Sequence, residues 1–123
     1  MRPRFSTSLV VEFRQTGVKR VLRTDLRYYS RRIDALLRIP SGFETDFASV
    51  PRLPLAFLLA GDTGHYAAVV HDWLYSGRSD VAVSRRAADD VLLEALEVTG
   101  VAWWRRWPMW LAVRLFGGRC WRA

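Results

Sequence analysis

Hydrophobic and polar residues alternate along the first third of the chain in a way that predicts β-strands. Three stretches rich in β-branched and aromatic residues are separated by polar breaks; they cover residues 5–14, 18–29 and 33–39. Gln15-Thr16-Gly17 between the first two favours a hairpin turn. The partial alternation in the second stretch indicates a sheet buried on one face, with the arginines on the other. We therefore expect a small antiparallel sheet of about three strands.

After residue 40 the pattern changes from a strand period to a helix period. Pro40-Ser41-Gly42-Phe43 has the composition of a turn. Beyond it, apolar residues recur three and four positions apart, which predicts helices with one buried face. We expect three or four of them: a short one over 53–59, one over about 64–76, one over 84–98, and a last one with Pro108 in its first turn and Gly117 at its end. The fold class is therefore α+β, with the helices packed on one side of the sheet.

The helix over 84–98 has readable signals at both ends and on both faces. Ser84 is a good N-cap, and Gly100 follows the last turn. One face is predicted to be core, and the opposite face to meet solvent. The core positions are Ala88, Val91, Leu92, Ala95 and Val98, and the solvent positions are Arg86, Asp90, Glu94 and Glu97. Asp89 differs from Asp90 because it borders the apolar stripe.

Length and composition fit one domain. A chain of 123 residues, 50% hydrophobic, can bury one modest core. We expect a strand platform over 1–39, a motif-bearing region over 40–100 and a Trp/Arg-rich segment over 101–123. The only cysteine, Cys120, can form no internal disulfide. Neither a signal peptide nor a spanning helix is expected, so synthesis is placed in the cytoplasm.

The net charge of +7 is divided unevenly along the chain. Residues 1–38 carry ten basic and three acidic groups, residues 39–100 four and nine, and residues 101–123 five and none. Basic surfaces attract nucleic acid, anionic lipid or acidic proteins, and they also simply keep proteins soluble. Nucleic acid is the weakest of these partners, because only the charge supports it and no helix-turn-helix pattern is present.

A charged pair stands in the middle of an apolar helix. His71 and Asp72 interrupt the segment HYAAVVHDWLY, and both are expected to share one helix face with Ala68 and Tyr75. Aspartate is almost never buried without a partner. The flanking segments supply candidate partners and supporting residues: Thr45, Asp46, Ser49, Arg52, Arg85 and Asp89.

This constellation predicts general-base chemistry, with a second reading that is purely structural. His71 would take a proton from water, and Asp89 on the next helix would fix its tautomer. Asp72, with Asp46 and its loop, would hold calcium or another divalent cation. Alternatively, a satisfied buried network only makes a small fold rigid. Ser49 is a candidate nucleophile by residue type alone.

The most aromatic part of the chain is its last segment. Tryptophans are mixed there with arginines, a combination found at bilayer interfaces and at protein interfaces. An equal alternative is that the rings complete a small core by packing on the sheet. The candidate interface residues are Trp103, Trp104, Trp107 and Trp110. Self-association into a homo-oligomer is compatible with the same pattern.

Two resemblances add to this interpretation. The segments GFETDFASVPR, AAVVHDWLY, SRRAAD and AVRLFG, in this order, resemble the phage-associated family called domain of unknown function 1353. Membership implies a phage or prophage origin and a small virion- or lysis-associated protein. It implies no particular activity.

HDWLY is also similar to the HDxCY helix motif of secretory A2-type phospholipases. That resemblance implies His71 as base, Asp72 on calcium, Asp89 holding the histidine and Tyr75 in support. The flanking cysteines and the glycine-rich calcium loop of those enzymes are absent, so GFETDFASV would have to replace that loop.

Two functions follow as hypotheses. The first is a metal-dependent, calcium-like hydrolase of a cell-envelope component, located at the inner face of the host envelope. The second is a non-catalytic tail, neck or baseplate protein that binds other virion proteins. An anionic membrane surface is a further candidate partner.

Overall fold

Buried and more exposed residues alternate along the strands, as the sequence predicts. The computed structural model describes residues 1–13, 20–45 and 64–122. In β4 (Leu26–Ser30), Leu26, Tyr28 and Ser30 are buried while Arg27 is exposed, and in β5 (Ala35–Ile39), Leu37 and Ile39 are buried while Leu36 is exposed. This period of two places one face of each strand on the core.

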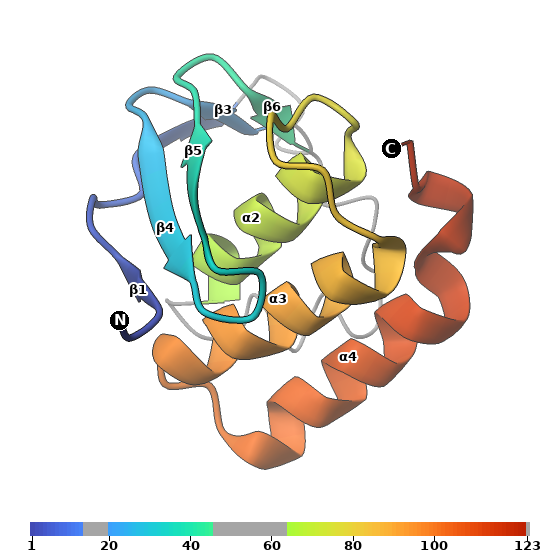
Figure 1. The fold of residues 1–123 in the computed structure, drawn as a ribbon. Helices are drawn as coiled ribbons and strands as arrows, with labels where there is room; N and C mark the ends of the chain where they lie inside the picture. Colours follow the sequence, from blue (N-terminus) through green and yellow to red (C-terminus); the bar gives the residue numbers. More distant parts are fainter. Residues whose placement is uncertain (14–19, 46–63, 123) are drawn as a thin grey trace.

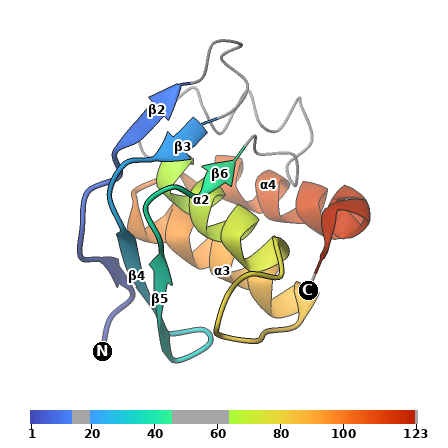
Figure 2. The ribbon, with the colours of Figure 1, turned by 90° about the horizontal axis from the view of Figure 1, so that it is seen from above.

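The strands are divided between two antiparallel sheets rather than collected in one. One sheet has the order β1-β4-β5, with β1 at Arg4–Phe5. The other has the order β2-β3-β6, formed by Val11–Phe13, Arg20–Leu22 and Glu44–Thr45 (Figures 1 and 2). The predicted pairing of the first two stretches is confirmed, since Val11 faces Leu22 and Phe13 faces Arg20. Its turn at 15–17 lies outside the described residues.

A local break explains why the predicted stretch over 18–29 contributes to both sheets. The Asp25 carboxylate accepts the backbone N–H of Ser41 at 2.8 Å and the Arg38 guanidinium at 2.8 Å. The chain bends at Arg23 and Thr24, between β3 and β4, and each half pairs with different strands.

Three α-helices follow in the described part of the chain, which confirms the α+β class. They are α2 (Gly64–Tyr75), α3 (Arg85–Val98) and α4 (Trp103–Phe116), and a 3-10 turn, η1 (Gly117–Cys120), follows α4. Gly77 and Gly100 have φ of 78° and 85° just beyond α2 and α3, the left-handed conformation that ends helices. The predicted helix over 53–59 lies outside the described residues. None of the described helices is long and apolar enough to cross a bilayer.

The helices and sheets share one core. α2 packs against β5 and α3, and α4 packs against α3 on the side away from the sheets (Figures 1 and 2). The buried cluster joins residues from every layer, including Tyr28, Leu37, Val70, Leu92 and Met109. α2 is thus surrounded by protein, which accounts for its nearly uniform apolar composition.

Two details of the helices correct the sequence predictions. α4 begins at Trp103, so Pro108 lies inside the helix and not in its first turn. A proline there removes one backbone hydrogen bond, a loss that the helix tolerates. Val98, expected in the core, is exposed at the end of α3.

The acidic side of α3 is also less solvated than predicted. Asp90 accepts the Arg32 guanidinium at 2.9 Å and the Trp110 indole N–H at 2.9 Å. Glu94 accepts the Tyr28 hydroxyl at 2.6 Å and the Arg32 backbone N–H at 2.8 Å. These carboxylates therefore connect α3 to the β4–β5 turn and to α4, contacts that a helical wheel cannot show.

The cap of α3 gives the first testable prediction. The Ser84 hydroxyl accepts the backbone N–H of Ala87 at 3.1 Å, as the sequence predicts. Ser84→Ala leaves that N–H without this acceptor, and we expect the free energy of unfolding to fall by about 1 kcal/mol. Urea unfolding measures the change. Ser84→Asp should retain most of the stability because aspartate is an equivalent cap; an equal loss in both variants would contradict the capping role.

Candidate functional site

A histidine on α2 and an aspartate on α3 meet inside the protein. The side chains of His71 and Asp89 are both fully buried, and Nε2 of the imidazole lies 2.7 Å from Oδ1 of the carboxylate. α2 and α3 pack closely, and Ala67, Ala68 and Ala88 are completely buried. Small residues on both helices let the two backbones approach each other. The sequence-predicted partnership of His71 and Asp89 is thus present in the geometry.

Asp89 is the acceptor on which several donors converge. Its Oδ1 also accepts the Tyr75 hydroxyl at 2.5 Å, and its Oδ2 accepts the Arg114 guanidinium at 2.8 Å. His71 and Tyr75 are one helical turn apart, so both reach the same carboxylate oxygen. We call His71, Tyr75, Asp89 and Arg114 the Asp89 cluster.

The cluster keeps the carboxylate ionised. Burial of Asp89 favours its neutral form, but the hydrogen bonds from His71 and Tyr75 and the bond from Arg114 outweigh it, so the pKa of Asp89 lies below its ordinary value of 3.8. Burial and the hydrogen bond to Asp89 raise the pKa of Tyr75 above its ordinary value of 10.0. Asp89 is therefore an anion and Tyr75 a neutral donor at physiological pH.

The ionised carboxylate determines the histidine tautomer. The ionised carboxylate lies 2.7 Å from Nε2 and can only accept a hydrogen bond, so Nε2 carries the hydrogen. In a neutral imidazole the lone pair is then on Nδ1. The tilted contact of the Tyr75 ring, with its centroid 4.2 Å from that of the imidazole, fixes the ring plane further. The imidazole of His71 is thus held in one orientation against Asp89.

Arg85 supports the cluster from the start of α3. Its Nε donates to the Tyr75 hydroxyl at 3.2 Å, and its terminal nitrogen donates to the carbonyls of Val113 and Arg114 at 2.7 and 2.8 Å. Carbonyls in the last turn of a helix have no partner within the helix. One side chain therefore ties α2, α3 and the end of α4 together, and it places Arg114.

Arg114 is the member of the cluster that the sequence analysis missed. It lies within the segment AVRLFG, but its position among tryptophans and arginines favours a surface role. The available signal was the charge of Asp89: a fully buried carboxylate needs a cation as well as a histidine. Arg85, predicted as a supporting residue, donates to the Tyr75 hydroxyl.

Asp72 does not share the face of His71 as the sequence predicts, and it has a different neighbour. Its Oδ2 accepts the hydroxyl of Thr45, a buried residue at the end of β6. Asp72 is thus directed at the strand that precedes residue 46, and His71 is directed at α3. Of the remaining predicted site residues, Asp46, Ser49 and Arg52 lie outside the described residues.

Over 1–13, 20–45 and 64–122, no three His, Cys, Asp or Glu side chains are grouped as cation ligands. Thr45 and Asp72 bring two oxygen-bearing side chains together. They suit a hard cation in type but not in number, because calcium takes six to eight oxygens.

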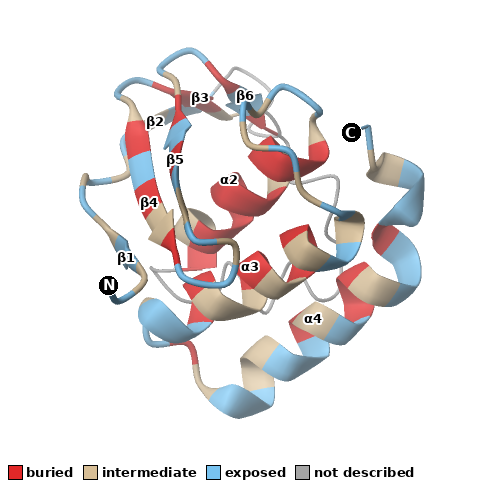
Figure 3. Ribbon diagram, in the orientation of Figure 1, coloured by how far each residue is buried: buried red, intermediate tan, exposed pale blue. Residues whose placement is uncertain are grey.

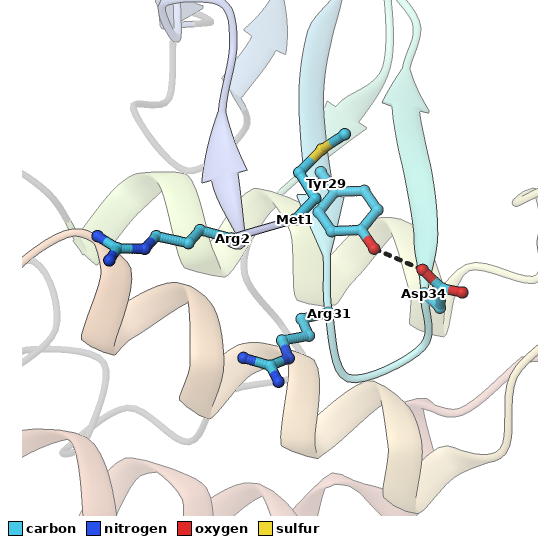
Figure 4. A pocket seen from close by; sticks show the side chains of 5 residues that line it. All are labelled: Met1, Arg2, Tyr29, Arg31 and Asp34. Atoms are coloured by element: carbon cyan, nitrogen blue, oxygen red, sulfur yellow. Dashed lines mark hydrogen bonds between the residues drawn. The ribbon is translucent and has the colours of Figure 1, made fainter.

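Two surface hollows of the described chain lie apart from the Asp89 cluster. The one in Figure 4 has a volume of about 480 Å³ and is lined by Tyr29 of β4, by Arg31 and Asp34 of the β4–β5 turn, and by Met1 and Arg2. Tyr29 donates to Asp34 across it at 2.5 Å. The other, about 460 Å³, lies on α4 among its tryptophans. Neither is lined by His71 or Asp89.

Comparisons with known proteins give one match. A family model described as Protein of unknown function (DUF1353) matches residues 20–113. That span is well over half of the chain and includes His71, Tyr75 and Asp89; Arg114 is the next residue after it. No curated protein and no solved structure matches the chain.

Proposed function

The chain belongs to the DUF1353 family of proteins of unknown function, and from this premise we propose that it is a phage- or prophage-encoded hydrolase acting on a cell-envelope component. One observation carries the proposal: the imidazole of His71 is buried, oriented and hydrogen-bonded at 2.7 Å to an ionised aspartate. Histidine is the residue that most often acts as general acid or base in proteins, and a carboxylate on its second nitrogen orients the ring.

Each member of the cluster has a defined part in the proposed reaction. Nδ1 of His71 takes a proton from a water molecule, and the resulting hydroxide attacks the scissile bond of the substrate. The imidazolium formed in this step is stabilised by the Asp89 anion on its other nitrogen. It then returns the proton to the leaving group, so no net proton is consumed at the base.

Tyr75, Arg85 and Arg114 act as positioning residues in this scheme. Tyr75 and Arg114 donate to Asp89 and keep it ionised and aligned, and Arg85 orients the Tyr75 hydroxyl. Since His71 has no exposed surface, catalysis requires that substrate binding opens a path to Nδ1. A divalent cation, with Asp72, Thr45 and Asp46 as oxygen ligands, would supply electrostatic stabilisation of the developing negative charge.

The test uses a substitution that keeps the hydrogen bond and removes the base. In His71→Gln the side-chain amide can still donate to Asp89, but it has no basic nitrogen. We expect turnover to fall at least 10²-fold, the usual contribution of a general base, while the free energy of unfolding falls by at most about 2 kcal/mol. Product release from phospholipid vesicles and isolated cell-wall sacculi, with calcium and with chelator, measures the activity.

The control is Glu97→Gln, an acid-to-amide change on the exposed end of α3, which should leave turnover unchanged. Turnover by His71→Gln equal to that of the wild type would rule out His71 as the base. No turnover of any envelope component by the wild-type protein would contradict the hydrolase itself.

Full burial of the cluster favours a second candidate, the non-catalytic virion protein. Satisfied buried networks make folds rigid without any chemistry, and neither His71 nor Asp89 has exposed side-chain surface. This candidate predicts no turnover, together with stoichiometric protein in purified phage particles, which mass spectrometry of the virion detects.

A further inference from the structure

The outer face of α4 carries a continuous apolar stripe that nothing in the described structure covers. Its residues follow the helical spacing of four, three and four positions: Trp104, Pro108, Leu111 and Leu115. Trp103 and Trp107 lie beside them, and Trp103, Trp104 and Leu115 are 67%, 58% and 65% exposed. We call these six residues the α4 stripe. α4 is the outermost helix, and its outward side is largely exposed (Figure 3).

Single exposed apolar residues are ordinary, but a stripe of this size is not. Contiguous exposed apolar surface marks membrane or protein contact sites. The opposite face of the same helix is already used, since Met109 and Val113 are buried in the core and Trp110 donates to Asp90. The stripe therefore does not contribute to the core of the fold. It is hollowed, because the tryptophan rings border a cavity of about 460 Å³.

The positive charge of the segment that carries the stripe favours a partner with a negatively charged surface. Residues 98–123 contain five arginines and no acidic residue, and Arg119 and Arg122 at the end of the chain are exposed. A symmetric pairing of two α4 helices would bring like charges together with no carboxylate from this segment to offset them. An anionic surface has the opposite sign, and tryptophan with arginine is the side-chain combination favoured at the bilayer interface.

We propose that the α4 stripe docks the protein onto an anionic lipid membrane, with α4 lying in the plane of the interface. Trp103, Trp104 and Trp107 enter the headgroup region together with the two leucines. The exposed Arg119 and Arg122 contact lipid phosphates. The inner side of α4 stays attached to the Asp89 cluster through Arg114. Docking does not depend on the proposed hydrolase, and His71→Gln should bind membranes like the wild type.

The experiment is vesicle sedimentation of the full chain with phosphatidylcholine vesicles, with and without phosphatidylglycerol. The wild type should bind the anionic vesicles at least about tenfold more tightly than the neutral ones, and lose most of this preference in about 0.5 M salt. Tryptophan fluorescence should shift to shorter wavelength on binding, as expected for rings that leave water.

Leu111→Gln/Leu115→Gln should weaken binding to anionic vesicles at least about tenfold. Leu36→Gln is the matched control, because Leu36 is a leucine of similar exposure, 57%, on β5, and its binding should stay within about twofold of the wild type. Absence of wild-type binding, or equal binding by the double variant, would overturn the proposal. So would lipid-independent dimerisation that the double variant abolishes, since it would assign the stripe to a second copy.

Discussion

Asp89→Asn should lower the free energy of unfolding by about 3–5 kcal/mol, the usual cost of removing one partner from a buried ion pair. The side chain is fully buried and accepts from His71, Tyr75 and Arg114. The asparagine amide has one acceptor oxygen where the carboxylate has two, and its NH₂ group would face one of these donors. The Arg114 charge would lose its counter-ion at the same time.

Urea unfolding at neutral pH measures this loss, and Asp90→Asn is the matched control. Asp90 is the next residue of α3, but its ion pair with Arg32 is partly exposed. We therefore expect a loss of only about 1 kcal/mol there. Equal losses in the two variants would mean that burial of the Asp89 carboxylate carries no special stabilisation.

The difference in unfolding free energy between the wild type and Asp89→Asn should depend on pH in one direction. The folded-state pKa of Asp89 lies below its ordinary value of 3.8, so its ionisation stabilises the fold above that value. This contribution is lost as pH falls through the folded-state pKa. The stability gap between wild type and Asp89→Asn should thus be constant near neutral pH and shrink in acid. A gap that widens below pH about 4 would contradict the assignment.

Local signals predicted the helices and the pairing within the site. Ser84 and the helix-ending glycines act through their own backbone neighbours, so the ends of α3 could be read from adjacent residues. The partnership of His71 with Asp89 was predictable because a buried polar side chain must find a partner. Asp89 was also the only acid of α3 at the border of its apolar stripe.

What the sequence did not predict depends on contacts between distant segments. The division into two sheets is accompanied by a bond of Asp25 to Ser41, sixteen positions apart. Arg114 reaches Asp89 because α4 packs on α3. The spacing of apolar residues within each helix does not show which helix packs against which. Likewise, Asp90 and Glu94 look solvated on a helical wheel until the β4–β5 turn places Arg32 beside them.

Arg114→Met should lower the free energy of unfolding by about 2–3 kcal/mol and move the acid limb of stability to higher pH. The methionine retains the apolar stem but leaves Asp89 with His71 and Tyr75 as its donors. Burial raises the pKa of Asp89, and the hydrogen bond from the Arg114 guanidinium at 2.8 Å lowers it. Removing the guanidinium therefore raises the pKa of Asp89. Urea unfolding between pH about 4 and 7 measures both effects. Arg119→Met, at an exposed arginine of η1, should change stability by no more than about 0.5 kcal/mol.

The double variant Asp89→Asn/Arg114→Met separates the ion pair from the rest of the cluster. Once Asp89 has lost its charge, Arg114 has no buried anion to stabilise, so removing it should cost little more. We expect the double variant to be more stable than the sum of the single losses predicts, by at least about 1 kcal/mol. Additive losses would mean that Arg114 stabilises the protein only through packing on α3. In that case Asp89 would depend on His71 and Tyr75 alone, and the orientation of the proposed base would rest on those two bonds.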